Sequence, residues 1–132
     1  MLELKGVHHI AIICSDYSKS KIFYTEILGL TILRETYRTQ RKSFKLDLCL
    51  HGNYVIELFS FPDHVSRPSR PESLGLRHLA FAVSNIEKEI RCLNGAGIQT
   101  EPVRVDELTG RRFTFFEDPD HLPLELYEET GS

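Results

Sequence analysis

The sequence lacks several features that mark particular classes of protein. Its 132 residues carry a net charge of −3, without the basic excess on which non-specific nucleic-acid binding depends. No apolar run approaches the roughly 18 residues needed to span a bilayer. The amino terminus also lacks the basic-then-apolar pattern of a signal peptide. We therefore expect a cytoplasmic protein that binds neither nucleic acid nor membrane.

Cysteine is scarce, and the motifs of several common enzyme classes are missing. Cys14, Cys49 and Cys92 are odd in number and lie in separate, largely apolar segments. Buried thiols in a reducing compartment explain this pattern better than a disulfide framework does. The chain has no glycine-rich phosphate loop, no CxxC pair and no serine nucleophile elbow. Any catalytic site must therefore be built from other residues.

The chain contains an internal repeat with an offset of 69 residues. Residues 8–30 match 77–98, residues 43–48 match 112–117 and, after a slip of one residue, residues 55–59 match 123–127. The matched pairs are His9 with His78, Ala11 with Ala80, Phe44 with Phe113 and Glu57 with Glu125. This period is too long for a solenoid unit of about 20–50 residues. The repeat therefore indicates a duplicated module.

Each module is predicted to fold as a strand, a helix and three further strands. The first helix is expected over 17–28 with Ser15 or Asp16 as N-cap, and the second over 86–93 with Ser84 or Asn85. Strands are expected near 31–37, 43–50, 53–60, 98–105, 111–117 and 122–128. The fold class is α+β, in a single domain of residues 1–132. Its parts are module 1 at about 5–61, a connecting loop at about 62–75 and module 2 at about 76–129.

The two modules place a histidine and a glutamate at equivalent positions. Glu57 and Glu125 each lie in the middle of an apolar strand, where a carboxylate is costly unless it is compensated. His9 and His78 begin the first strand of each module. Two imidazoles and two carboxylates would neutralise a divalent cation and leave coordination positions open. We predict that these four residues bind one Ni, Zn, Co or Mn ion, and their spacing does not choose among the metals.

The remaining histidines and arginines are weaker candidates. His8 adjoins His9 but has no counterpart in the repeat, so we expect it to pack against the site or to support a ligand. His51, His64 and His121 lie in predicted turns or loops, where we expect solvated side chains. For His121 the alternative is a place at the edge of the substrate pocket. Six arginines could contact an anionic substrate, although we expect most of them to be solvated surface residues: Arg67, Arg70, Arg77, Arg104, Arg111 and Arg112.

Several motifs resemble those of the vicinal oxygen chelate superfamily, and in particular its glyoxalase I-like (lactoylglutathione lyase-like) branch. They are "HHIAI", "YVIELF", "RHLAF", "FYTEILGL" and "EDPDHLPLEL". The resemblance implies two βαβββ modules whose curved mixed sheets pair into an open barrel. It also implies that His9, Glu57, His78 and Glu125 are the metal ligands.

The resemblance further implies a metal-dependent lyase or isomerase acting on a small ketoaldehyde–thiol adduct. The reaction would transfer a proton next to a carbonyl through a metal-bound enediolate. Glu125 is the preferred base, with Glu57 as the alternative. Ile13 and Phe61 stand where bacterial glyoxalase I has an arginine and an asparagine that contact glutathione. These substitutions argue against glutathione as the cosubstrate.

Three other functions fit the same sequence. They are a metal-free binding protein of the antibiotic-sequestering type, an Fe(II) ring-cleaving dioxygenase and an acyl-CoA epimerase. The two modules can pair within one chain or across a two-fold dimer, and the resemblance favours a homodimer.

Overall fold

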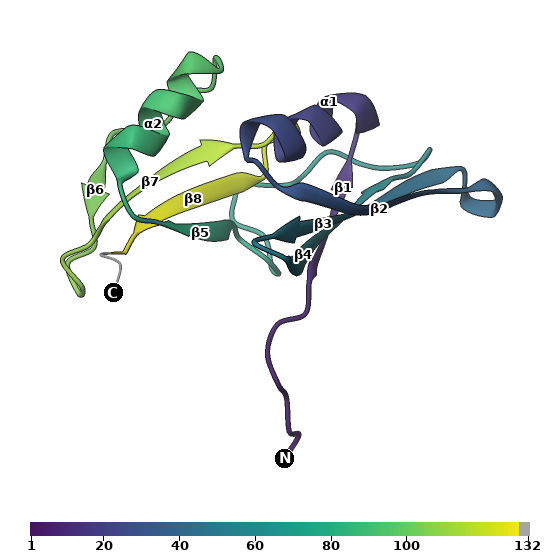
Figure 1. Ribbon diagram of the computed structural model, residues 1–132, viewed down its shortest axis with the longest axis horizontal. Helices are drawn as coiled ribbons and strands as arrows, with labels where there is room; N and C mark the ends of the chain where they lie inside the picture. Colours follow the sequence, from purple (N-terminus) through teal and green to yellow (C-terminus); the bar gives the residue numbers. More distant parts are fainter. Residues whose placement is uncertain (130–132) are drawn as a thin grey trace. The chain divides into compact units, whose positions relative to one another are not determined.

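The computed structural model describes residues 1–129 and contains two compact units, Met1–Val65 and Ser66–Ser132. Each unit has one four-stranded mixed sheet and a helical segment after its first strand (Figure 1). The order of elements is strand, helix and three strands in both units, which confirms the predicted α+β fold class with two βαβββ modules.

Unit 1 forms a sheet with the strand order β1-β4-β3-β2. Its elements are β1 (Ile10–Cys14), α1 (Tyr17–Ile22), η1 (Phe23–Ile27), β2 (Thr31–Arg38), η2 (Thr39–Arg41), β3 (Ser43–Leu50) and β4 (Asn53–Ser60). β1 is parallel to β4, and the other neighbours are antiparallel. The three strands predicted after the helix are confirmed, within one residue at each end.

The first helix begins as predicted but changes its winding halfway. Asp16 is the N-cap, and its side chain accepts a hydrogen bond from the backbone N–H of Lys19 at 3.1 Å. The segment continues as the π-helix η1, where Phe23 and Tyr24 are both buried. The core of unit 1 also contains the buried side chains of Leu30, Leu46, Leu48, Ile56 and Leu58.

Unit 2 repeats this plan with the strand order β5-β8-β7-β6. Its elements are β5 (Leu79–Val83), α2 (Ile86–Gly95), β6 (Arg104–Val105), β7 (Arg112–Glu117) and β8 (Pro123–Glu128). The helix is capped by Asn85, whose side chain accepts from Lys88 N–H at 3.1 Å. β5 is parallel to β8, and the other neighbours are antiparallel.

The strand predicted at 98–105 is wrong in extent, because only Arg104–Val105 pairs as a strand. Pro102 lies within the predicted segment, and proline has no N–H to donate to a neighbouring strand. The segment is instead attached to β7 at a single point. The Glu101 N–H donates to the carbonyl of Phe115 at 3.0 Å, and the hydroxyl of Thr114 donates to the carbonyl of Glu101 at 2.7 Å.

The strands that carry the predicted ligands pair in the same register in both units. Ala11 of β1 lies opposite Glu57 of β4, and Ala80 of β5 lies opposite Glu125 of β8. A histidine precedes each alanine by two residues. Because side chains alternate along an extended chain, that histidine points to the same side as the alanine.

The predicted match of the third strands is wrong by one residue. The residue opposite the glutamate is Asp47 in unit 1 and Phe115 in unit 2. Phe113 therefore corresponds to Lys45 rather than to Phe44. A slip of one residue turns every side chain to the opposite face of a sheet, so this correction changes which residues surround the glutamates.

The connector expected at 62–75 contains neither helix nor strand. Over residues 1–129, no helix is long and apolar enough to cross a membrane.

A cluster of hydrogen bonds joins the start of α2 to the sheet of unit 2. The carboxylate of Glu128 accepts from the N–H of Ile86 at 2.9 Å and from two nitrogens of Arg112, each at 2.9 Å. The Arg112 hydrogen bonds, followed by the Ile86 N–H, hold the pKa of Glu128 below its ordinary value. The ionised carboxylate therefore stabilises the folded state.

We predict that Glu128→Gln lowers the urea midpoint of unfolding at pH 7. Because the pKa of Glu128 is lowered by folding, its contribution is present above the unfolded pKa of about 4.3 and is lost as the pH falls through the folded value. The difference between variant and wild type should therefore shrink in acid. Urea titrations between pH 3 and pH 7 measure this, with the exposed Glu107→Gln as control. A constant difference across that range would contradict the assignment.

Candidate functional site

In unit 1, the structure brings His9 and Glu57 close together. His9 Nε2 lies 3.9 Å from Glu57 Oε1, and the side chains are 35% and 16% exposed. This separation is longer than a hydrogen bond. The parallel pairing of β1 with β4 produces the approach, because it places the residue before β1 beside the middle of β4. The pair is thus a product of strand register.

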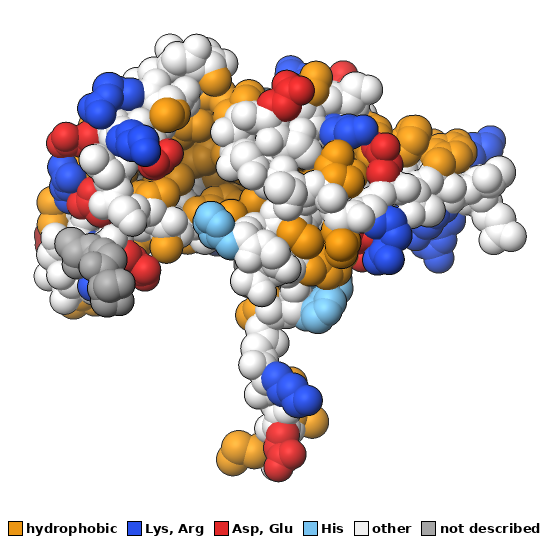
Figure 2. Space-filling view, in the orientation of Figure 1, with side chains coloured by type: hydrophobic (Ala, Val, Ile, Leu, Met, Phe, Trp, Pro, Cys, Tyr) orange, Lys and Arg blue, Asp and Glu red, His pale blue; other side chains and the backbone are white. Residues whose placement is uncertain are grey.

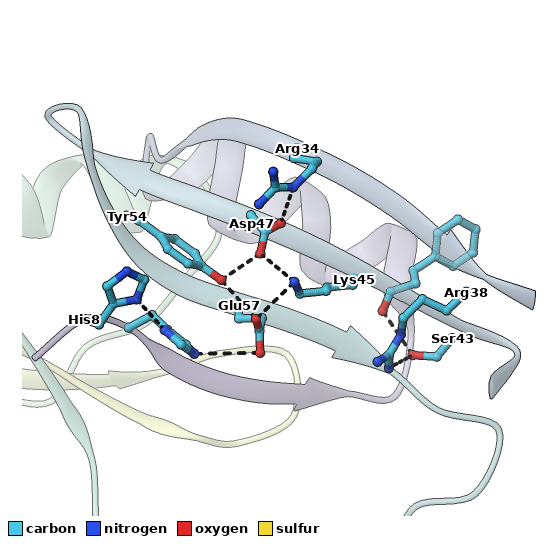
Figure 3. Close-up of polar contacts among 10 residues, drawn as sticks. His8, Arg34, Arg38, Ser43, Lys45, Asp47, Tyr54 and Glu57 are labelled. Carbon is cyan, nitrogen blue, oxygen red and sulfur yellow. Dashed lines mark hydrogen bonds and ion pairs between the residues drawn. The ribbon is translucent and has the colours of Figure 1, made fainter. Parts of the chain in front are cut away.

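A polar network holds the other oxygen of Glu57 (Figure 3). The Tyr54 hydroxyl lies 3.1 Å from Glu57 Oε2 and 2.7 Å from Asp47 Oδ1. Lys45 Nζ lies 3.3 Å from Glu57 Oε2 and 3.6 Å from Asp47 Oδ1. Arg34 Nε donates to Asp47 Oδ2 at 3.1 Å. Two cations and a hydroxyl therefore compensate two neighbouring carboxylates.

The network keeps Asp47 ionised although its side chain is fully buried. Burial raises the pKa of Asp47, but the hydrogen bonds from Tyr54 and Arg34, with the charges of Lys45 and Arg34, outweigh it and leave that pKa below its ordinary value. Burial, followed by the hydrogen bonds to Asp47 and Glu57, raises the pKa of Tyr54 well above its ordinary value. Tyr54 therefore remains a protonated donor.

His8 contacts the other histidine rather than the glutamate. Its Nδ1 lies 2.8 Å from Nδ1 of His9, so one ring donates and the other accepts. The ring of Tyr54 stacks on His9, with centroids 5.1 Å apart and planes 13° apart, and meets His8 edge-on at 5.3 Å. These contacts restrict the orientation of the His9 ring.

In unit 2, His78 and Glu125 form the equivalent pair in less polar surroundings. His78 Nε2 lies 3.5 Å from Glu125 Oε1, and the side chains are 27% and 13% exposed. The ring of Phe115 meets His78 edge-on at 4.9 Å. Over residues 1–129, no hydrogen bond is made by the Glu125 carboxylate or by the buried Nδ1 of His78. This second carboxylate thus lacks the network that surrounds Glu57.

The pair of unit 2 lines a cavity of about 950 Å³. The cavity wall contains Phe113, Phe115 and Phe116, together with four of the six arginines considered from the sequence: Arg67, Arg70, Arg77 and Arg104. His121 also borders it, and its Nδ1 lies 2.8 Å from Glu117. The cavity therefore combines aromatic walls with charged groups of both signs.

The two arginines outside this cavity wall differ from that group. Arg112 bonds to Glu128 and to Glu87, with Nη1 to Oε1 of Glu87 at 2.9 Å, and so joins α2 to the sheet. Arg111 does not line the cavity either. Neither residue is placed to contact a molecule bound there.

Within the part of the chain that the structure describes, no group of three or more His, Cys, Asp or Glu side chains is arranged so that it could hold a metal ion. Each unit supplies one histidine–glutamate pair. The single four-ligand centre stays a prediction. The sequence reading missed Asp47, Lys45 and Tyr54, although Asp47 in "FKLDLCL" has the same apolar frame that identified Glu57.

We predict that Tyr54→Phe lowers the free energy of unfolding by about 1–3 kcal/mol, because a buried carboxylate loses its hydroxyl donor. Urea unfolding at pH 7, followed by circular dichroism, measures the change. Tyr37→Phe is the matched control on β2 of the same sheet, where the side chain is 51% exposed. Equal stabilities of the two variants would show that the Tyr54 hydroxyl does not hold the network.

Curated relatives cover almost the whole chain. The uncharacterized protein YwkD of Bacillus subtilis is 64% identical over 126 residues, which cover 96% of this chain and 98% of the relative. The uncharacterized protein YaeR of Escherichia coli is 59% identical over 129 residues, which cover 98% and 100%. A glyoxalase family protein from Enterococcus faecalis has a crystal structure with a TM-score of 0.88 and 52% identity, covering 94% of this chain and 98% of that chain.

More distant structures share the fold. The fosfomycin resistance protein FosX from Listeria monocytogenes, complexed with Mn(II) and sulfate, gives a TM-score of 0.74 at 20% identity and covers 97% of this chain and 95% of its own. At this identity the likeness concerns the fold alone. The family model of the Glyoxalase/Bleomycin resistance protein/Dioxygenase superfamily matches residues 6–126. The repeated βαβββ units, the paired registers and these comparisons agree that the chain belongs to that superfamily.

Proposed function

We propose that the protein is a divalent-metal-dependent lyase or isomerase of the glyoxalase I type. It moves a proton next to a carbonyl of a small ketoaldehyde–thiol adduct. The observation that carries this proposal is the equivalent placement of two histidine–glutamate pairs, at 3.9 Å and 3.5 Å, on strands with the same register. In each pair the carboxylate is mostly buried and is not hydrogen-bonded by its histidine.

The donor set fits a divalent cation. His9, Glu57, His78 and Glu125 would hold one Ni, Zn, Co or Mn ion, with two neutral nitrogens and two anionic oxygens. Glu125 supports this fit, because a mostly buried carboxylate without a hydrogen bond needs a compensating charge. The ion, when bound, supplies Lewis-acid polarisation of substrate oxygens. As expected from the sequence, we further propose that the protein is a homodimer and lies in the cytoplasm.

The different surroundings of the two glutamates support Glu125 as the base. Glu57 is held at Oε2 by Tyr54 and Lys45, so moving it would break two contacts. Glu125 has no comparable restraint among residues 1–129 and lies in the wall of a cavity. It is therefore the carboxylate that can turn toward a substrate carbon, take its proton and return it to the neighbouring carbon.

A second candidate is a metal-free protein that binds a small molecule without transforming it. The cavity of unit 2 favours this function, because its volume and aromatic walls suit an organic ligand. Histidine–glutamate pairs at matching positions are not needed for such binding. Metal content therefore separates the two candidates.

We predict that the purified protein, after incubation with Ni, Co, Zn or Mn and removal of free ion, retains about one ion for each set of two histidines and two glutamates. Atomic emission spectrometry measures the content. His9→Ala and His78→Ala should each reduce retention, while His64→Ala in the connector should not. Retention below about one fifth of an ion per chain with every metal would favour the metal-free candidate.

Glu125→Gln should reduce turnover of the adduct at least 100-fold, in the range lost when general-base catalysis is removed. The amide has almost the shape of the carboxylate but cannot take a proton. Loss of proton exchange at the substrate carbon, followed by NMR in deuterated water across a panel of thiols, is the measurement. Glu107→Gln is the control. Undiminished exchange in Glu125→Gln would exclude Glu125 as the base.

A further inference from the structure

Arg38 presents a guanidinium on the face of the unit 1 sheet that carries Glu57. Its central carbon lies 4.7 Å from the ring centroid of Phe59 and 5.6 Å from that of Phe61. The two rings are themselves stacked, with centroids 5.5 Å apart. Arg38 Nη2 also donates to the Ser43 hydroxyl at 3.1 Å. Cation–π contact and this hydrogen bond fix the guanidinium in place.

The charge of Arg38 is not compensated by a carboxylate. On the same sheet, the nearby cations Arg34 and Lys45 both pair with Asp47. Over residues 1–129, Arg38 makes no ion pair, and its buried Nε has no acceptor. Arginine has five N–H donors in a planar fork that matches a carboxylate or a phosphate. The Nε of Arg38 is buried, so the donors left for a ligand are those of the two terminal nitrogens that the hydrogen bond to Ser43 does not use.

A comparison with unit 2 shows that stacking alone does not leave an arginine available. Arg104 lies over Phe113 at 4.9 Å and over Phe115 at 5.6 Å, much as Arg38 lies over its two rings. Arg104, however, donates to Glu101 Oε1 through two nitrogens, at 3.0 Å and 2.6 Å. Its charge is neutralised within the chain, and that of Arg38 is not.

The surroundings of Arg38 carry a positive charge in a chain that is acidic overall. Residues 31–50 contain five basic side chains, Arg34, Arg38, Arg41, Lys42 and Lys45, against two acidic ones, Glu35 and Asp47. Lys and Arg side chains gather where β2 and β3 meet (Figure 2). Such a local potential attracts anions.

Arg38 also lies close to a predicted metal ligand. Phe59, beneath the guanidinium, follows Glu57 by two residues on β4, a distance of about 7 Å along a strand. Figure 3 shows Arg38 and Glu57 on the same side of the sheet. If the reacting oxygens of a substrate lie near Glu57, a charged group a few bonds away from those oxygens would reach Arg38.

We propose that Arg38 is the anion-binding residue of this site, which takes a carboxylate or phosphate group of the substrate. Its role as a specificity residue rests on the proposed function, whereas anion binding by the guanidinium does not. Phe59 and Phe61 orient the fork, and Ser43 holds one corner of it.

The first test uses the full chain without metal, so that it is independent of catalysis. Sodium acetate and sodium phosphate are titrated against sodium chloride at constant ionic strength, while NMR follows the Arg38 Nε–H and the backbone amides of Ser43 and Phe59. We expect a saturable shift with at least one of the two anions, and the anion that saturates first identifies the ligand class. Arg38→Gln should abolish the saturable response of the amides, and Arg38→Lys should retain part of it.

Arg41→Gln is the matched control, because it removes an exposed positive charge three residues away. It should leave the saturable shift in place. A response that is linear with both anions, or equal in wild type and Arg38→Gln, would overturn the assignment.

The second test addresses specificity in turnover. For an adduct of thioglycolate, which has a carboxylate, Arg38→Gln should raise KM about tenfold and leave kcat within twofold. For an adduct of the neutral thiol 2-mercaptoethanol, KM should stay the same. Equal effects on both adducts would contradict the specificity role. If neither adduct reacts with wild type, the proposed function fails while the anion titration still decides the assignment of Arg38.

Discussion

The parallel pairing of the first and last strands of each unit is the constraint on which the candidate site depends. It places Ala11 opposite Glu57 and Ala80 opposite Glu125, so that a histidine two residues earlier approaches the glutamate. The histidine and the glutamate of each pair are almost 50 residues apart in the sequence, so only the pairing of the strands brings them together. The register is held by apolar side chains on the opposite face, where a slip of one residue would expose Leu58 or Leu126.

The duplicated units preserve this pairing but differ in what surrounds it. In unit 1 the position opposite the glutamate is Asp47, which brings Tyr54 and Lys45 into one network. In unit 2 the same position is Phe115, and the network is replaced by aromatic side chains. One glutamate is therefore restrained by several polar partners, whereas the other lies in a cavity wall and makes no hydrogen bond with residues 1–129. The two equivalent positions therefore hold carboxylates in chemically distinct surroundings.

The sequence predicted the fold class, most strands and both helices, because turn residues and apolar periodicity are local signals. It predicted the short strand β6 poorly, since a proline-containing segment that only two hydrogen bonds at Glu101 attach to β7 resembles a strand in composition. The histidine–glutamate pairs were accessible because a repeat reveals equivalent positions. The sequence comparison placed the one-residue slip of the repeat after β3, whereas the structure places it before β3. The residues predicted to lie beside Glu57 were therefore wrong by one position. Arg38 and Tyr54 were missed because their significance arises from contacts across strands, of Arg38 with Phe59 on β4 and of Tyr54 with Asp47 on β3.

The residue at position 61 shows how the loss of one polar group can be offset elsewhere. Phe61 stands where the resemblance to glyoxalase I leads one to expect an asparagine, which by itself suggests a site that no longer recognises an anion. In the structure, however, its ring stacks on Phe59, and the guanidinium of Arg38 lies over both. An asparagine could not provide that aromatic surface. The phenylalanine just after β4 therefore supports the guanidinium at the end of β2, which fits the anion-binding role proposed for Arg38.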